Sequence, residues 1–163
     1  MNGGAGKSRA GIGGAGMGRA RTSRIGGRGE QAAAEYLAER GYRLLDRNWR
    51  SRDPDQRGEL DLVLRHRGTL VVCEVKARTG ARLAHPAEAV TPEKAARLRR
   101  LAVLWLRDHA HAARPARPHG RLPIGRRPRA VAAAEVRIDV VAVWLGPREP
   151  FPVLGVEHLQ GVA

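Results

Sequence analysis

The sequence predicts a single α/β domain whose core helices and strands follow the order αβββαβ. Its 163 residues are enough for one hydrophobic core, and 42% hydrophobic with 28% charged residues is the composition of a soluble globular protein. Two segments carry apolar residues at helical spacing, and four short runs are rich in aliphatic residues, as strands are. Two of these runs fold back on each other and carry acidic residues and a lysine. We expect one domain over residues 25–163.

The chain opens with a Gly- and Arg-rich segment, residues 1–24, that has little apolar surface to bury. We expect it to be a disordered tail. Its GGAGKS run at residues 3–8 resembles the end of a phosphate-binding P-loop. The first glycine of that pattern and the preceding strand are both missing, which excludes a nucleotide site here.

A helix is predicted from about Arg28 to Gly41, because strong helix formers are followed by a glycine suited to a helix end. Ala34 and Leu37 form its apolar stripe, and Glu30 shares that stripe by its spacing. Two interpretations of Glu30 stay open. An acid in the first turn complements the helix dipole, whereas an acid that points toward a carboxylate cluster is a candidate ligand.

Residues 42–50 are predicted to form a strand and residues 51–57 a polar loop. The next stretch, residues 58–78, is predicted to be a hairpin of two strands around the two-residue turn Arg67-Gly68.

The register of this hairpin follows from its apolar pattern, because a slip of one residue would mix acids with leucines on both faces. The pairs on one face are then all apolar: Leu60 with Val75, Leu62 with Cys73 and Leu64 with Val71. On the other face Asp61 lies opposite Glu74, and Glu59 lies opposite Lys76. Two carboxylates and an ammonium therefore converge.

A second helix is predicted to start at Thr91, a good N-cap residue that is followed by a proline in the first helical position. Its apolar stripe leaves Lys94, Arg97 and Arg100 near one edge. Such a row is usually a solvated helix face. It becomes a candidate phosphate contact if it borders the acidic face of the hairpin.

Residues 109–134 are rich in proline and arginine, without apolar periodicity, and are expected to be a flexible insertion. The histidines in this segment lack the spacing of a zinc site. Residues 136–145 are predicted to be a central strand, and residues 156–159 a short edge strand. Within the central strand, Asp139 is expected to pair with Arg137 or Arg78 rather than with a metal.

The formal net charge of +14 suggests an acidic partner, nucleic acid first. Residues 1–28 hold six basic residues and no acidic one, and so do residues 109–134, so most of the excess charge lies in two segments predicted to be unstructured. Basic arms around a nearly neutral body would hold a polyanion. The alternative is an arginine-rich tail without a ligand.

The remaining composition excludes several classes of protein. No apolar run approaches the length of a membrane span, and the N-terminus has no apolar signal-peptide region, so we expect a cytoplasmic protein with no membrane partner. Cys73 is the single cysteine, which excludes an internal disulfide, and its place among apolar residues indicates a core residue. The oligomeric state, monomer or homodimer, is left open.

The chemistry of Asp61, Glu74 and Lys76 suggests phosphodiester hydrolysis. Two neighbouring carboxylates repel each other unless a proton or a cation lies between them, and hard oxygen ligands suit Mg²⁺. A lysine on the same strand face can orient an attacking water or help to deprotonate it. The alternative is a salt-bridged sheet face, with Glu59 beside Lys76, which contributes at most about 1 kcal/mol.

The pattern Asp61, Glu74, Val75, Lys76 resembles the core motif of the PD-(D/E)XK nucleases. A longer series of motifs, in order, is similar to the YraN family of bacterial proteins: GRGE at 27–30, RNWR at 47–50, GELDLV at 58–63, CEVKAR at 73–78, AVTPEKAARLRRLA at 89–102 and RIDVVAV at 137–143. The resemblance spans about residues 27–145.

This resemblance implies a restriction-endonuclease-like core, with a mixed central sheet flanked by helices. It implies that Glu30, Asp61, Glu74 and the carbonyl of Val75 ligate Mg²⁺, and that Lys76 serves the attacking water. The candidate nucleic-acid contacts are basic residues on the surrounding elements: Lys94, Arg97, Arg78 and Arg28.

Three functions are therefore compatible with the sequence. The first is an Mg²⁺-dependent endonuclease that acts on DNA, branched or otherwise structured. The second is a non-catalytic nucleic-acid-binding module with the same fold. The third is a protein-interaction role in which the acidic cluster is structural. Because aromatic residues make up only 4% of the chain, arginine and lysine contacts to phosphates are expected to dominate binding.

Overall fold

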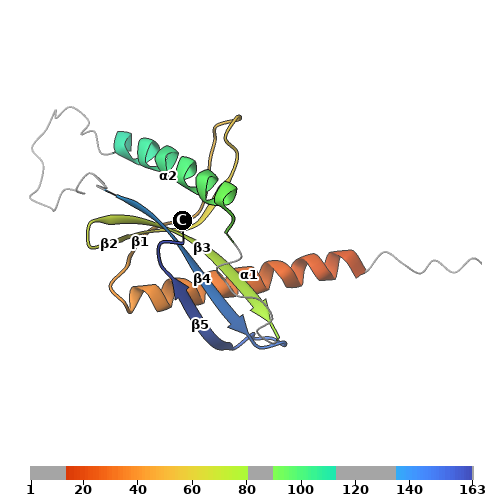
Figure 1. The fold of residues 1–163 in the computed structure, drawn as a ribbon. Helices are drawn as coiled ribbons and strands as arrows, with labels where there is room; N and C mark the ends of the chain where they lie inside the picture. The colour runs from red at the N-terminus through yellow and green to blue at the C-terminus, as the bar shows by residue number, and fades with distance from the viewer. Residues whose placement is uncertain (1–13, 81–89, 113–134, 163) are drawn as a thin grey trace, which may run out of the picture.

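A computed structural model describes residues 14–80, 90–112 and 135–162 of the chain (Figure 1). The elements, in chain order, are α1 (Gly14–Ala38), β1 (Arg43–Arg50), β2 (Glu59–His66), β3 (Thr69–Thr79), α2 (Pro92–Ala112), β4 (Val136–Leu145) and β5 (Val153–Leu159). The predicted α/β class is confirmed. The predicted edge strand at residues 156–159 is present and starts three residues earlier, at Val153.

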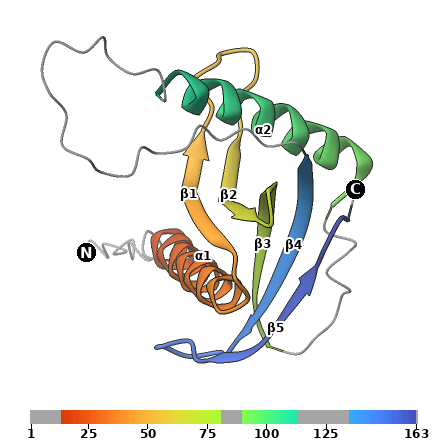
Figure 2. The ribbon, with the colours of Figure 1, turned by 90° about the vertical axis from the view of Figure 1, so that its left-hand side faces the viewer.

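The five strands form one mixed sheet in the order β1-β2-β3-β4-β5. Neighbouring strands are antiparallel except β3 and β4, which are parallel. A parallel neighbour cannot follow through a tight turn, and α2 lies in the connection between these two strands. Figure 2 shows α1 on one side of the sheet and α2 crossing the other.

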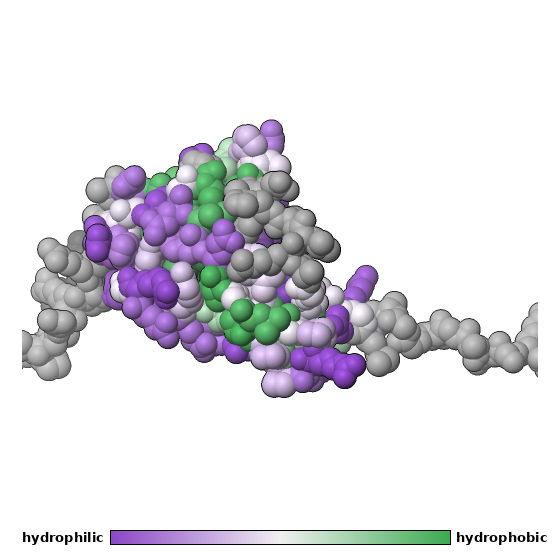
Figure 3. Space-filling model, turned by 60° about the horizontal axis from the view of Figure 1, so that its bottom comes forward, coloured by the Kyte–Doolittle hydropathy of each residue, from purple (hydrophilic) through white to green (hydrophobic). Residues whose placement is uncertain are grey.

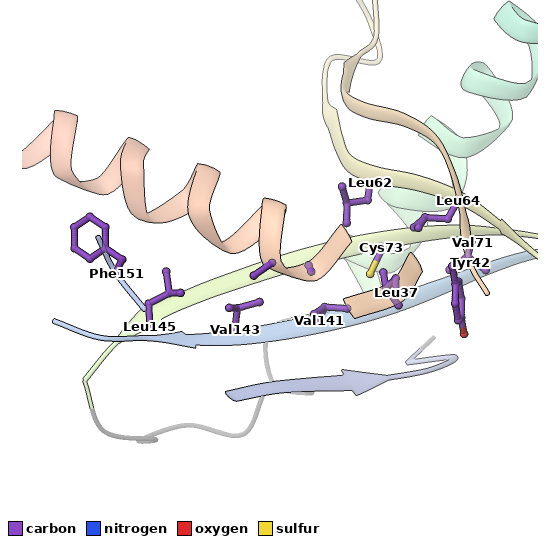
Figure 4. Close-up of a cluster of buried hydrophobic side chains, with 12 residues drawn as sticks. Leu37, Tyr42, Leu62, Leu64, Val71, Cys73, Val141, Val143, Leu145 and Phe151 are labelled. Atoms are coloured by element: carbon purple, nitrogen blue, oxygen red, sulfur yellow. The ribbon is translucent and has the colours of Figure 1, made fainter. Parts of the chain in front are cut away.

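Each face of the sheet buries its own hydrophobic cluster, because side chains of β3 alternate between the faces. Val71 and Cys73 pack in the cluster beneath α1, which Figure 4 shows, whereas Leu70 and Val72 pack beneath α2. Full burial of one such aliphatic side chain contributes about 1.5–3 kcal/mol. Cys73 is buried, as predicted, and burial raises the pKa of its thiol.

The predicted turn of the hairpin is confirmed. His66 pairs with Thr69, and the two residues between them have positive φ angles, 49° at Arg67 and 94° at Gly68. Two successive left-handed residues match the right-handed twist of the strands that they join, and a glycine meets this requirement without strain.

The predicted register holds for Leu62 with Cys73 and for the pairs between them and the turn. It is wrong for Leu60 and Val75, which belong to opposite faces: Leu60 packs in the cluster beneath α2, and Val75 packs against the cluster beneath α1. Regular pairing of β2 and β3 ends at Leu62 and Cys73. Beyond these residues, Oδ2 of Asp61 forms a hydrogen bond with the Val75 amide, at 2.8 Å. It uses a donor that a continuous ladder would direct to a β2 carbonyl.

Helix α1 begins well before the predicted start at Arg28, so the expectation of a disordered tail is wrong for residues 14–24. The N-terminal part of this helix contacts the connection between β4 and β5. Arg21 donates to the carbonyl of Pro147 at 2.7 Å, and Arg24 pairs with Glu149 at 2.7 Å. Residues 1–13, the rest of the expected tail, lie outside the described residues.

Helix α2 starts as predicted: Pro92 is its first residue, and the Lys94 amide donates to Oγ1 of Thr91 at 3.3 Å. The helix runs to Ala112, so the first four residues of the predicted flexible insertion are helical. The remainder of that insertion, residues 113–134, lies outside the described residues.

Asp139 is buried on β4 and pairs with Arg137, as predicted. The guanidinium donates to both carboxylate oxygens, at 2.8 and 2.9 Å. His158 on β5 lies 2.8 Å from the same carboxylate, and the amide of Gly161 donates to it at 3.0 Å. Asp139 on β4 therefore connects this strand to β5 and to Gly161 by hydrogen bonds.

Hydrophilic residues predominate on the face seen in Figure 3, and hydrophobic ones form smaller separate areas. The large apolar side chains that are exposed in the described residues are Leu44, Val103, Val153 and Leu154. Neither described helix is long and apolar enough to cross a membrane.

Candidate active site

Asp61 lies where β2 and β3 separate. Regular pairing of these strands ends at Leu62 and Cys73, and the Asp61 carboxylate accepts the amide hydrogen of Val75. Burial and, second to it, the nearby Glu74 carboxylate raise the pKa of Asp61 to about 6. The side chain thus carries a charge that its surroundings do not fully compensate.

Glu74 lies on β3 and is 9% exposed. Its Oε1 accepts hydrogen bonds from Nζ of Lys76 at 2.6 Å and from Nζ of Lys94 at 2.7 Å. Burial alone would raise the pKa of Glu74, but the hydrogen bonds from the two ammonium groups outweigh burial and lower it. Glu74 is therefore ionised at neutral pH, next to a carboxyl group with a raised pKa.

Lys76 shares a strand face with Glu74, two residues away. Burial alone would lower the pKa of Lys76, but its hydrogen bond to Glu74 and the neighbouring negative charge outweigh burial and raise it. The ammonium stays protonated at neutral pH. It can donate hydrogen bonds to a water or a phosphate, and it cannot act as a base in this state.

Lys94 lies on α2, which follows β3 in the chain. Its ammonium pairs with Glu74 on the acidic face of the hairpin. The sequence placed Lys94 near an edge of α2, and its contact with Glu74 fulfils the condition for a phosphate-contact candidate. Arg97, one turn further along α2, is exposed and donates to the carbonyl of Arg57 at 3.2 Å.

Glu30 approaches from the opposite side of the sheet. Its helix contacts β3 closely at Gly29, where an added Cβ would lie 2.5 Å from the Cβ of Ala77. The Glu30 carboxylate is near enough to Asp61 to raise the pKa of that residue, less than Glu74 does. Its Oε2 accepts a hydrogen bond from Nδ2 of Asn48 at 2.8 Å.

Asn48 is a residue of this region that sequence reasoning did not single out. It lies within β1 with a positive φ of 51°, which Asn tolerates better than most residues. The pairs Arg47 with Leu62 and Trp49 with Leu60 bracket it, so its register position is opposite Asp61. An asparagine inside an otherwise charged and apolar strand was the available signal.

The other predicted residues are less closely connected to the acids. The backbone of Val75 lies between Glu74 and Lys76, and its amide is the donor to Asp61. Arg78 is exposed on β3, on the same strand face as Glu74 and Lys76. Arg28 is half-buried on α1, and no contact of its side chain with the acids is found.

The donors present fit a hard divalent cation in chemistry, although they do not form a closed cage. Asp61, Glu74 and a backbone carbonyl are oxygen ligands of the kind that Mg²⁺ takes. A cation between the two carboxylates would relieve the electrostatic cost that raises the pKa of Asp61. Among the described residues, no three carboxylate, histidine or cysteine side chains are grouped closely enough to hold a metal.

The fold and the adjacent Asp61, Glu74 and Lys76 define an α/β protein with a restriction-endonuclease-like core. The model of the family described as "Uncharacterised protein family UPF0102" matches residues 29–143. The chain belongs to this family, which is the YraN family of the PD-(D/E)XK superfamily, so the resemblance seen in the sequence is confirmed.

Relatives from several bacteria match most of the chain. A UPF0102 protein of Frankia alni is 44% identical over 137 residues, which cover 84% of this chain and 92% of the relative. One from Frankia casuarinae is 52% identical over 137 residues, covering 84% and 93%. One from Clavibacter michiganensis subsp. michiganensis is 50% identical over 124 residues, covering 76% and 84%.

Proposed function

We propose that this protein is an Mg²⁺-dependent nuclease that hydrolyses phosphodiester bonds in DNA, with branched or otherwise structured DNA as its substrate. One observation carries the proposal: the Glu74 carboxylate lies between the ammonium groups of Lys76 and Lys94, beside Asp61 with its raised pKa. The two carboxylates can hold a cation, and the two ammonium groups can donate hydrogen bonds to a phosphoryl group. A simple surface salt bridge offers neither.

The proposed ligands of the cation are Asp61, Glu74, Glu30 and the carbonyl of Val75. When bound, Mg²⁺ supplies Lewis-acid stabilisation of the negative charge that develops on the phosphoryl oxygens. The described protein groups have separate tasks. Asp61 stays in position through the Val75 amide, and Asn48 orients Glu30.

Lys76 has the task of donating hydrogen bonds to the attacking water, or to the phosphate that it attacks. Its raised pKa favours this role over deprotonation of the water. Lys94 adds a second ammonium on the same side and is suited to a non-bridging phosphate oxygen. Arg97, Arg78 and Arg28 are proposed to contact phosphates further from the scissile bond, which predicts strongly salt-dependent binding.

The test is cleavage of labelled junction, flap and duplex DNA in Mg²⁺ by the wild type, Asp61→Ala and Lys76→Ala. We expect each variant to lose at least about a hundred-fold in rate, as when a transition-state contact is removed. Asp55→Ala, an exposed acid of the β1–β2 loop, is the matched control and should cleave normally. Cleavage that persists undiminished in both site variants would remove this mechanism.

A second candidate is a non-catalytic nucleic-acid-binding module with the same fold. It is favoured by the two lysines that already neutralise Glu74 and by the hydrogen bond that holds Glu30 at Asn48. It predicts salt-sensitive binding without turnover, binding that survives Asp61→Ala, and weaker binding when residues 1–13, which precede α1, are deleted.

A further inference from the structure

The β1–β2 loop and α2 both lie at the top of the view in Figure 1. Residues of both elements line a groove. It consists of two hollows of about 920 and 610 Å³, and residues 50–53 line both. We call the two together the loop groove. The volume of each hollow lies within the range of ligand-binding pockets, which is about 300–1,000 Å³.

Helix α2 connects the loop groove with the candidate active site. Arg97 lines its smaller hollow and Leu104 its larger one. Lys94, Arg97 and Leu104 are three and seven residues apart along α2, so they share one side of the helix. Because Lys94 contacts Glu74, a chain in the groove would lead away from the acids for about 15 Å along α2, at 1.5 Å per residue.

The rim of the loop groove carries arginines that lack an acidic partner. Arg52, Arg57 and Arg107 are exposed, and within the described part of the chain none of their side chains forms an ion pair. Arg50 is neutralised by Glu59 at 2.9 Å. Acids also line the groove, among them Asp53, whose Oδ1 accepts the amide of Asp55 and so serves the loop itself.

The larger hollow has an apolar surface beside these arginines. Trp49 and Leu104 line it, and both also pack against the cluster beneath α2, which holds them in place. A tryptophan ring next to guanidinium groups suits an unpaired base with its phosphates. In a duplex the faces of the bases are covered by their neighbours, so this combination favours a single strand.

We propose that the loop groove binds a single-stranded segment of nucleic acid, with a base against Trp49 and phosphates on Arg52, Arg57 and Arg107. The inference rests on the proposed function in one respect, because it names the form of DNA that is presented to Asp61 and Glu74. The substrate class is then DNA with an unpaired arm, such as a flap, rather than a continuous duplex.

The test uses the full chain in buffer with EDTA, where cleavage does not occur, and fluorescence anisotropy of a labelled oligo(dT). The double variant Arg52→Gln/Arg107→Gln should weaken binding about ten-fold. It should also reduce the slope of log affinity against log salt by about 1.4, for two lost phosphate contacts. The control Arg99→Gln/Arg148→Gln removes the same charge from exposed arginines outside the groove and should change affinity less than about two-fold.

Trp49→Leu keeps an apolar side chain in the groove and tests stacking separately. It should weaken oligo(dT) binding about ten-fold. Oligo(dT) should quench tryptophan fluorescence in the wild type and leave it unchanged in this variant, since Trp105 and Trp144 are buried. Equal weakening in the groove and control variants would overturn the inference. So would a duplex of the same length that binds as tightly as oligo(dT), or quenching that persists in Trp49→Leu.

The two proposals fail in different experiments. If Asp61→Ala cleaves DNA normally, the proposed function is wrong, whereas the groove is still tested by binding without metal. If the groove variants bind oligo(dT) like the wild type while Asp61→Ala loses cleavage, the nuclease proposal stands and the groove inference is wrong.

Discussion

The ammonium of Lys94 on α2 lies 2.7 Å from Oε1 of Glu74 on β3, the same oxygen that accepts a hydrogen bond from Lys76. This contact connects the helix that follows the hairpin to the acids on the hairpin. It also explains why a largely buried glutamate has a lowered pKa, because two cations outweigh the cost of burial.

Lys94→Met should therefore raise the pKa of Glu74 while Lys76 keeps the carboxylate partly neutralised. The free energy of unfolding should change by no more than about 1 kcal/mol, since the ammonium of Lys94 is partly exposed. NMR titration of the side-chain carboxyl carbons measures the pKa directly. Arg99→Gln, on the exposed side of the same helix, is the control, and an equal shift in both variants would contradict the assignment.

Asp61→Asn should stabilise the metal-free protein above pH 6. The folded pKa of Asp61, about 6, exceeds its ordinary value of 3.8, so the folded state binds more protons than the unfolded state between these values. Stability therefore falls as pH rises through this range, by roughly 1–3 kcal/mol. Asparagine can still accept the Val75 amide without the charge.

Urea unfolding in EDTA between pH 4 and pH 8 measures this effect. The wild type should lose stability across the range relative to Asp61→Asn, and Asp55→Asn should follow the wild type. Parallel curves for the wild type and Asp61→Asn would show that the carboxylate carries no electrostatic cost.

Gly29→Ala should destabilise the protein by roughly 1–3 kcal/mol, because the new Cβ would lie 2.5 Å from the Cβ of Ala77, which has no flexible end to move. Gly27→Ala, at a helical position with nothing within 4 Å, should instead stabilise it by about 0.5–1 kcal/mol. Thermal unfolding compares the two. The double variant Gly29→Ala/Ala77→Gly should recover part of the loss, and no recovery would mean that the clash is not the cause.

Asp139→Asn should cost about 3–5 kcal/mol at neutral pH, because the buried carboxylate balances Arg137 and holds His158 on β5. Burial alone would raise the pKa of Asp139, but hydrogen bonds from His158 and Arg137 outweigh burial and lower it. The stability that Asp139 contributes is therefore present at neutral pH and is lost as pH falls from 3.8 through its lowered pKa. Denaturant unfolding at neutral and acid pH measures both the loss of stability at neutral pH and its dependence on pH.

Asp108→Asn is the control for that experiment, since Asp108 is an exposed acid on α2. A loss at neutral pH no larger in Asp139→Asn than in Asp108→Asn would contradict the role given to the buried carboxylate.

The hairpin shows how far the sequence can predict this fold. Its turn and most of its register follow from apolar alternation and from Gly68, because one slipped residue would bury acids. Alternation carries no information about a side chain that bonds to the neighbouring strand. The hydrogen bond that the Val75 amide donates to Asp61 is such a case, and next to it the pattern predicts the wrong face for Leu60.

The start of α1 could not be predicted for a related reason. The glycines of residues 14–24 disfavour a helix on local grounds, and the segment has little apolar surface to bury. The contacts of Arg21 with Pro147 and of Arg24 with Glu149 join segments more than a hundred residues apart in the chain, and no local pattern encodes them.

The candidate site likewise has a part that the sequence predicts and a part that it does not. Asp61, Glu74 and Lys76 could be predicted together because they lie on one hairpin, although its regular pairing ends at Leu62 and Cys73. The contact of Lys94 with Glu74 and that of Asn48 with Glu30 depend on how helices pack on the sheet. Arg52 and Arg107 of the loop groove also come from separate elements.

The most direct test of a metal site at Asp61 and Glu74 is the pKa of Asp61, measured by carboxyl NMR titration without and with saturating Mg²⁺. Without metal, the pKa should be about 6. With Mg²⁺ it should fall well below that value, because a bound cation favours the ionised carboxylate. A pKa of Asp61 that is the same in the presence and absence of Mg²⁺ would contradict the account.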